Sequence, residues 1–292
     1  MDQAEKLRNV VKLKNQKSKP NARVITVTSG KGGVGKSNIA VNLGVQMQKL
    51  GKKVLVFDAD FGLANVEVMF GAVPKWNLSD LIFRGKTIEE IISEGPLGMG
   101  FISGGTGITE LSELTQDQLY YLIKCFAELD RMADVIIVDT GAGISNRVLE
   151  FVMASQEVIV VTTPDPSSLT DAYSLLKALY RNPKFDCADT DVSILANRVL
   201  TAQEGKNVYD KLNSVVDQFL QEKISYVGMI PQDQVLEKSI RQQKVVSLYA
   251  PASKSARAFE AMASRLLNHE QQQKRISRGI SDLLSSFWKR EA

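Results

Sequence analysis

The chain has 292 residues, 44% of them apolar, so it can bury a sizeable core as one large domain with appendages, and no apolar run approaches the roughly 20 residues that span a bilayer. Its two cysteines, Cys125 and Cys187, lack metal-ligand spacing and are too few for a disulfide framework, and the lysine-rich N-terminus has no signal-peptide core, so we expect a cytoplasmic protein. The net charge of +3 is uneven: residues 24–273 carry 24 basic and 29 acidic side chains, which argues against a nucleic-acid-binding body and predicts basic ends that meet an anionic surface or a protein.

The chain begins with a short helical pattern and a linker. Leu7, Val10 and Val11 recur at helical spacing before lysines, asparagines and Pro20 end the pattern. One apolar stripe does not stabilise a short helix in water, so we expect residues 1–22 to be a flexible tail that folds on a partner.

A phosphate-binding loop follows the first predicted strand, Val24 to Val27. The sequence GKGGVGKS fits the pattern G-x-x-x-x-G-K-[ST], in which glycines turn successive N–H groups inward and a helix N-terminus faces the anion. The lysine neutralises the outer phosphates and the serine hydroxyl approaches Mg²⁺. The expected nucleotide contacts are Gly30, Gly32, Gly33, Val34, Gly35, Lys36, Ser37 and Asn38.

The remaining elements alternate between strands and helices. A helix is expected to run from this loop to about Leu50, and residues 61–103 suggest short helices and a strand. Further strands are predicted at 52–60, 133–143, 157–166, 191–199 and 224–233, with helices at 116–131, 167–180 and about 203–221. This alternation predicts an α/β fold with a mostly parallel sheet and helices on both faces.

Three aspartates follow β-branched runs and should meet at the carboxyl edge of this sheet. Asp139 fits a carboxylate that holds the Mg²⁺ water shell opposite Ser37, and the spacing of Asp58 and Asp60 puts both on one side of their strand. A strand-terminal aspartate often only caps a turn. Three of them together with a phosphate loop favour a metal–nucleotide site.

The second lysine of the loop, Lys31, resembles the deviant Walker A motif of the MinD/ParA ATPases. That resemblance implies a P-loop NTPase fold, ATP/ADP and Mg²⁺ as ligands, and an ATP-bound homodimer in which Lys31 reaches the partner's nucleotide. It also implies that Asp60 positions the attacking water and that Asp58 supports the magnesium region. Lys31 and Asp60 are therefore the expected catalytic residues, and Ser37, Asp58 and Asp139 the expected metal-associated ones.

Two loops match positions where this family holds the base. Asn197 matches the asparagine that binds the adenine edge, and Arg198, Pro231 and Asp233 match neighbouring segments. For Arg198 and Asp233 an ordinary strand-end turn is a serious alternative.

The C-terminal segment, residues 271–292, combines an apolar stripe with basic residues and a tryptophan. It suits either a membrane interface or a helix packed on the body, and the resemblance to MinD-like proteins, in which such a helix is the membrane-targeting element, favours peripheral binding to the inner face of the cell membrane. The expected membrane contacts are Ile276, Ile280, Leu283, Leu284, Phe287 and Trp288.

The N-terminal sequence DQAEKLR resembles the DQAxxLR motif of FlhG-type proteins (also called YlxH or FleN), MinD-like regulators of flagellar placement and number. The resemblance implies that residues 2–8 bind and stimulate the SRP-type GTPase FlhF, with Gln3, Leu7 and Arg8 in contact. It also implies flagellar switch (C-ring) proteins as partners, and no nucleic acid is expected. The chain then divides into a tail (1–22), an ATPase domain (23–270) and a membrane helix (271–292).

Three alternatives remain. A ParA-type DNA-partition ATPase conflicts with the acidic body and with the apolar face of the terminal helix. A relative of the iron–sulfur carriers needs paired cluster-ligating cysteines, and no CxxC is present. A binding module without activity is disfavoured because Lys31, Lys36, Ser37, Asp60 and Asp139 all occur together.

Overall fold

The structure is a computed structural model that describes residues 21–60, 65–105, 114–272, 279–283 and 285. The predicted contacts Gln3, Leu7, Arg8, Ile276, Leu284, Phe287 and Trp288 lie outside these residues. Within the described residues, no helix is long and apolar enough to cross a membrane.

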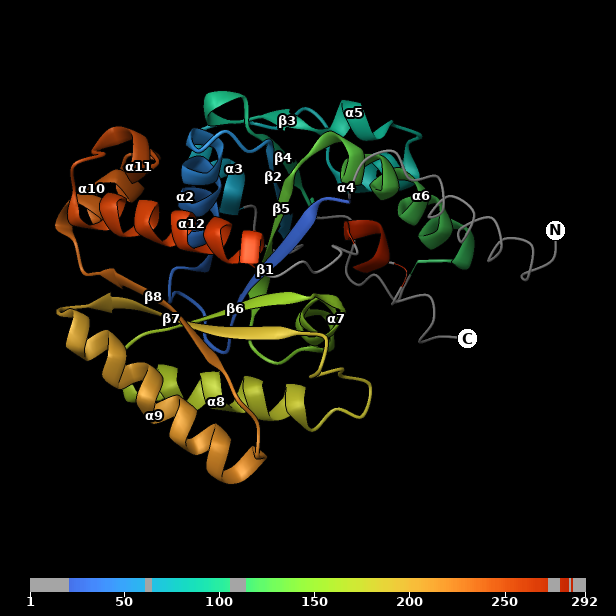
Figure 1. Cartoon of the computed structure of the whole chain (residues 1–292). Coiled ribbons are helices and arrows are strands. Elements are labelled where there is room, and N and C mark those ends of the chain that lie inside the picture. The colour runs from blue at the N-terminus through green and yellow to red at the C-terminus, as the bar shows by residue number, and fades with distance from the viewer. Residues whose placement is uncertain (1–20, 61–64, 106–113, 273–278, 284, 286–292) are drawn as a thin grey trace.

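An eight-stranded sheet in the order β3-β4-β2-β5-β1-β6-β7-β8 forms the centre of the molecule (Figure 1). Its neighbouring strands run parallel except for the short antiparallel pair β3–β4 at one edge. The strands are β1 (Arg23–Ser29), β2 (Val54–Ala59), β3 (Ser93–Glu94), β4 (Gly100–Ser103), β5 (Val135–Ala142), β6 (Glu157–Thr162), β7 (Asp191–Val199) and β8 (Ser225–Pro231). The predicted mostly parallel α/β sheet is confirmed.

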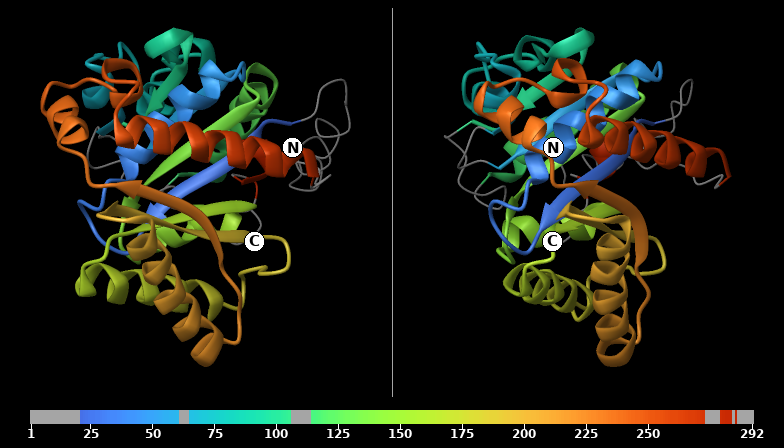
Figure 2. Two further views of the ribbon diagram at one scale, coloured as in Figure 1. Left: turned by 60° about the vertical axis from the view of Figure 1, so that its left-hand side comes forward. Right: turned by 90° about the vertical axis from the view of Figure 1, so that its left-hand side faces the viewer.

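Helices cover both faces of the sheet, with α2 and α12 on one side and α8 and α9 on the other (Figures 1 and 2). Both faces of β1 are therefore buried: Ile25 and Val27 pack towards α2, and Val24 packs towards α6. The larger helices are α2 (Lys36–Lys49), α6 (Gln116–Met132), α7 (Asn146–Ala154), α8 (Pro166–Tyr180), α9 (Ala202–Leu220), α10 (Gln234–Arg241) and α12 (Lys254–Gln272). The shorter ones are α3 (Asn65–Phe70), α4 (Leu78–Phe83), α5 (Ile88–Ile91), the 3₁₀ turn η1 (Pro96–Gly98) and α11 (Val246–Tyr249).

Two predicted membrane contacts, Ile280 and Leu283, lie in the protein core. Both are at most 2% exposed and belong to the apolar cluster formed largely by α4, α5 and α6. The Asp130 carboxylate accepts hydrogen bonds from the Ile280 and Ser281 backbone N–H groups, at 2.7 and 3.2 Å, and from the Ser281 hydroxyl at 2.6 Å. The described part of the C-terminal segment is thus docked on the body, and these two side chains would have to leave the core to reach a membrane.

Candidate functional site

The phosphate loop joins β1 to α2 at the carboxyl edge of the sheet, where parallel α/β proteins bind ligands. Gly35, the residue before the helix, has a φ of +103°, and a Cβ there would lie 2.5 Å from the Asn197 side-chain nitrogen. Only glycine combines an easy positive φ with the absence of a Cβ that would collide with Asn197. The loop therefore depends on a residue that arrives from β7, far along the chain.

Lys36 opens α2 and lies buried, 7% exposed, among carboxylates. Burial lowers the pKa of Lys36, while the charges of Asp139 and Asp60 act in the opposite direction. A desolvated ammonium that keeps its charge needs anionic partners. The incoming phosphates of a nucleotide would add to that stabilisation.

Asp139 is fully buried, and neither of its carboxylate oxygens has a hydrogen-bond partner among the described residues. Burial raises the pKa of Asp139, and the neighbouring Ser37 hydroxyl and Lys36 ammonium oppose that rise. Leaving such a group unpaired costs free energy unless a ligand satisfies it. Oxygen donors beside a serine hydroxyl suit the water shell of Mg²⁺, so the residues present fit that ion.

Asp58 and Asp60 take different positions although they are two residues apart. Asp58, 2% exposed, accepts hydrogen bonds from the backbone N–H groups of Asp60, Asn65 and Val66, each at 3.1 Å. Burial, with the nearby Asp139 charge, raises the pKa of Asp58. Asp60 instead lies over Gly141, where a Cβ would be 3.5 Å from its carboxylate, and its charge acts on Lys36.

Lys31 contacts the first turn of α8. Its ammonium donates a 2.5 Å hydrogen bond to the Ser167 hydroxyl in the first turn of α8. The two lysines of the loop thus have different neighbours. Lys36 interacts with Asp139 and Asp60, and Lys31 binds Ser167 at the edge of the site.

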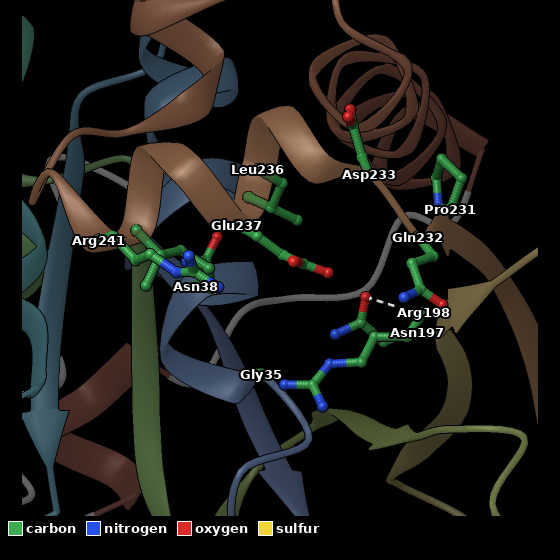
Figure 3. A pocket seen from close by; sticks show the side chains of 11 residues that line it. Gly35, Asn38, Asn197, Arg198, Pro231, Gln232, Asp233, Leu236, Glu237 and Arg241 are labelled. Atoms are coloured by element: carbon green, nitrogen blue, oxygen red, sulfur yellow. Dashed lines mark hydrogen bonds between the residues drawn. The ribbon is translucent and has the colours of Figure 1, made fainter.

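A pocket of about 360 Å³ opens beside the phosphate loop (Figure 3), within the range of small-molecule sites. It brings together six predicted nucleotide contacts: Gly35, Asn38, Asn197, Arg198, Pro231 and Asp233. The remaining lining residues are Gln232, Leu236, Glu237, Ile240 and Arg241. Sequence reasoning missed these five, although Asp233 at a helix start followed by apolar residues at 236 and 240 is the pattern of an N-capped amphipathic helix.

Two consecutive residues near the end of β7, Asn197 and Arg198, contact the phosphate loop directly. The Asn197 amide donates to the Val34 carbonyl at 2.7 Å, and the Arg198 guanidinium donates to the Gly33 carbonyl at 2.8 Å. Arg198 adopts a positive φ of 59°, which a plain strand end would not require. The pocket and the phosphate loop are therefore joined by direct hydrogen bonds.

Asp233 lines the pocket, but its carboxylate serves the local turn. It accepts from the Val235 N–H at 2.9 Å, which caps α10, and from the Ser255 hydroxyl and N–H of α12 at 2.8 and 3.1 Å. Burial would raise the pKa of Asp233, but the hydrogen bonds from Ser255 outweigh it and the pKa is lowered. The hydrogen bonds of the Asp233 carboxylate in this structure are those of a residue that forms a strand-end turn.

Comparison with known protein families gives one match over most of the chain. Residues 25–246 match the family model described as the CobQ/CobB/MinD/ParA nucleotide binding domain. The match begins inside β1 and ends at the first residue of α11, so it includes the phosphate loop, the three aspartates and the pocket.

Two relatives match most of the chain. It is 40% identical over 254 residues to the antiactivator FleN of Pseudomonas aeruginosa, which covers 87% of this chain and 89% of the relative. It is 34% identical over 299 residues to the flagellum site-determining protein YlxH of Helicobacter pylori, which covers 99% of this chain and 97% of the relative.

Solved structures show the same architecture. The MinC:MinD cell division complex of Aquifex aeolicus matches with a TM-score of 0.66 and 25% identity, covering 87% of this chain and all of that chain. MinD complexed with Mg-ADP from Pyrococcus horikoshii matches with a TM-score of 0.65 and 23% identity, over 87% of this chain and 100% of the other. A likeness at that identity supports the fold.

Proposed function

Since the chain belongs to the CobQ/CobB/MinD/ParA nucleotide-binding family, in its FlhG (YlxH/FleN) branch, and is an ATPase of that family, we propose that it is an ATP-dependent dimerising switch that controls flagellar number or placement. ATP with magnesium would favour the dimer, and hydrolysis to ADP would return the monomer. The flagellar role rests on the likeness to the flagellum site-determining protein YlxH, supported by the likeness to the antiactivator FleN.

The observation that carries this proposal is the unsatisfied Asp139 carboxylate at the phosphate loop. A fully buried carboxylate without a partner in the described residues, next to Ser37 and Lys36, supports magnesium–nucleotide binding. When bound, Mg²⁺ neutralises charge on the phosphates. On this proposal Lys36 binds the outer phosphates, Ser37 and Asp139 hold the ion's ligand shell, with Asp58 supporting that region, and Asp60 orients the attacking water.

The position of Lys31 supports a second copy of the chain as partner. The exposed Lys31 ammonium donates a hydrogen bond to the Ser167 hydroxyl of α8. On this proposal Lys31 would reach the nucleotide of a second subunit across a shared face, and there it would stabilise the charge on the transferring phosphoryl group.

We further propose that the dimer binds the inner face of the cell membrane through residues 271–292. A single helix with a few apolar anchors binds a bilayer weakly, and two linked helices bind far more strongly by avidity. Ile280 and Leu283 would have to exchange their core contacts for lipid, so membrane binding competes with docking. Flagellar switch proteins are the proposed cytoplasmic partners.

The test is the molecular mass of the full chain in ADP and in ATP with Mg²⁺, measured by light scattering. We expect a monomer with ADP and a dimer with ATP, and co-sedimentation with phosphatidylglycerol-containing vesicles only in ATP. An unchanged mass in the two nucleotides would contradict the switch.

The membrane step needs a variant that keeps the core intact. Deleting residues 274–292 would remove the buried Ile280 and Leu283. Phe287→Glu and Trp288→Glu change two of the expected membrane contacts and leave Ile280 and Leu283 in place. We expect the double variant to dimerise normally and to lose vesicle binding. Retained binding, or equal binding in both nucleotides, would count against the membrane role.

The N-terminal tail is the proposed activator of the SRP-type GTPase FlhF. A peptide of residues 1–23 should stimulate GTP hydrolysis by that GTPase, and Gln3→Ala should return the rate to the basal level. The physical reason is that a glutamine amide both donates and accepts hydrogen bonds and so orients an attacking water. Gln16→Ala, in the same tail, is the matched control and should keep the stimulation. A GTPase indifferent to both the peptide and the full chain would exclude this role.

A further inference from the structure

The Asp60 carboxylate accepts a hydrogen bond from the side chain of Asn65, the first described residue after Asp60. The Asn65 amide donates a hydrogen bond of 3.3 Å to the Asp60 Oδ2 oxygen. We propose that Asn65 is a positioning residue for hydrolysis, which fixes the Asp60 carboxylate so that its other oxygen faces the reacting water. This inference rests on the proposed role of Asp60.

The backbone of Asn65 is hydrogen-bonded, and the residue after it is buried. Asn65 is the first residue of α3, and the next residue, Val66, is fully buried in the core against α2 and β2. The Asp58 carboxylate accepts the backbone N–H groups of both, at 3.1 Å each. Asn65 therefore has a fixed backbone from which its side chain reaches Asp60.

The Asp58 carboxylate also accepts a hydrogen bond from the backbone of Asp60. Oδ1 of Asp58 accepts the Asp60 N–H at 3.1 Å, while Oδ2 accepts the two N–H groups of α3. The Asp58 carboxylate thus binds the backbones of both Asp60 and Asn65, and the side chains of these two residues bind each other.

The direction of the hydrogen bond decides what Asn65 does. The amide donates to Oδ2 alone, whereas Oδ1 lies on the Gly141 side, 3.5 Å from the position of a Cβ there, with the charge of Lys36 close enough to act on Asp60. Without the hydrogen bond from Asn65, the Asp60 carboxylate could rotate, and it would face the reacting water only part of the time. Misplacement of a reacting group by about 1 Å costs on the order of 10²-fold in rate, so holding one rotamer is worth a measurable factor.

The contacts of Asn65 allow its two roles to be separated. Its backbone N–H serves Asp58 and its side chain serves Asp60, so Asn65→Ala removes only the second contact. Alanine is also the best helix former, so α3 is not weakened. Val68→Ala, on the same helix with a side chain that is 51% exposed, is the matched control.

The experiment compares ATP turnover, KM and thermal unfolding for the unmodified chain, Asn65→Ala, Asn65→Asp and Val68→Ala. We expect Asn65→Ala to lower kcat by about tenfold or more with KM and Tm unchanged. Asn65→Asp should lower it further because a second carboxylate repels Asp60, and Val68→Ala should match the unmodified chain.

A double-mutant cycle with Asp60→Ala distinguishes positioning from a purely structural effect. If Asn65 acts through Asp60, adding Asn65→Ala to Asp60→Ala changes neither the residual rate nor the lifetime of the ATP-bound dimer. Normal kcat in Asn65→Ala, or an equal additional loss in the Asp60→Ala background, would overturn the inference while the unmodified chain still turns over ATP. Absence of turnover in the unmodified chain would instead overturn the proposed function and this inference with it.

Discussion

Replacing Asp60 with alanine is expected to leave ATP binding and dimerisation intact and to reduce turnover by about 10²-fold or more, the usual contribution of a positioned catalytic group. The Asp60 carboxylate lies beside Gly141, and its charge acts to raise the pKa of Lys36. Unlike the fully buried Asp139, Asp60 is only partly buried. Removing it deletes the acceptor that orients water without removing a phosphate ligand. ATP affinity should stay the same or rise slightly, because one negative charge near the phosphates is lost.

The measurement is single-turnover hydrolysis together with ATP affinity and the mass of the ATP complex. The Asp60→Ala chain should accumulate as an ATP-bound dimer that persists after the unmodified chain has returned to the monomer. Asp60→Asn, which keeps the shape but not the charge, should behave in the same way. A parallel fall in nucleotide affinity and rate would reassign Asp60 to metal binding or to structure.

The two loop lysines are expected to fail in different ways when each is changed to alanine. Lys36→Ala should lose most ATP affinity, because truncating one partner of a buried charge pair costs about 2–5 kcal/mol. Lys31→Ala should bind ATP as a monomer with near-normal affinity, since its ammonium contacts Ser167 at the rim rather than the aspartates. It should then fail to dimerise and fail to hydrolyse.

The two variants are matched controls for each other, since both remove one lysine from the same glycine loop. Nucleotide affinity by calorimetry and mass by light scattering separate the binding step from the association step. If Lys31→Ala dimerised and hydrolysed ATP like the unmodified chain, the proposed contact with the partner's nucleotide would be wrong.

The sequence alone determined the fold class and the phosphate loop, because both depend on local patterns. β-branched runs that are buried on both faces predict parallel strands, and each predicted strand is present within a few residues. The glycines and Lys36 predict the loop, and the position of Asp58, Asp60 and Asp139 after such runs predicts their shared sheet edge. The short helices α7, α10 and α11 were not predicted, because apolar patterns of nine or fewer residues near loops carry little periodic signal. The 19-residue helix α12 was not predicted either.

Only the tertiary structure decided how distant segments use their polar groups. Asn197 was predicted to bind the adenine base, and in the structure its amide also donates a hydrogen bond to the Val34 carbonyl. This contact forms because β7 and β1 end at the same edge of the sheet with β6 between them. The Asp233 carboxylate caps α10 and binds Ser255 of α12, which spacing cannot reveal. The amphipathic segment that suits a bilayer equally suits the apolar cluster beside α6, and Asp130 supplies the acceptor for its first N–H groups. An apolar stripe specifies that it must be covered, and the rest of the fold determines what covers it.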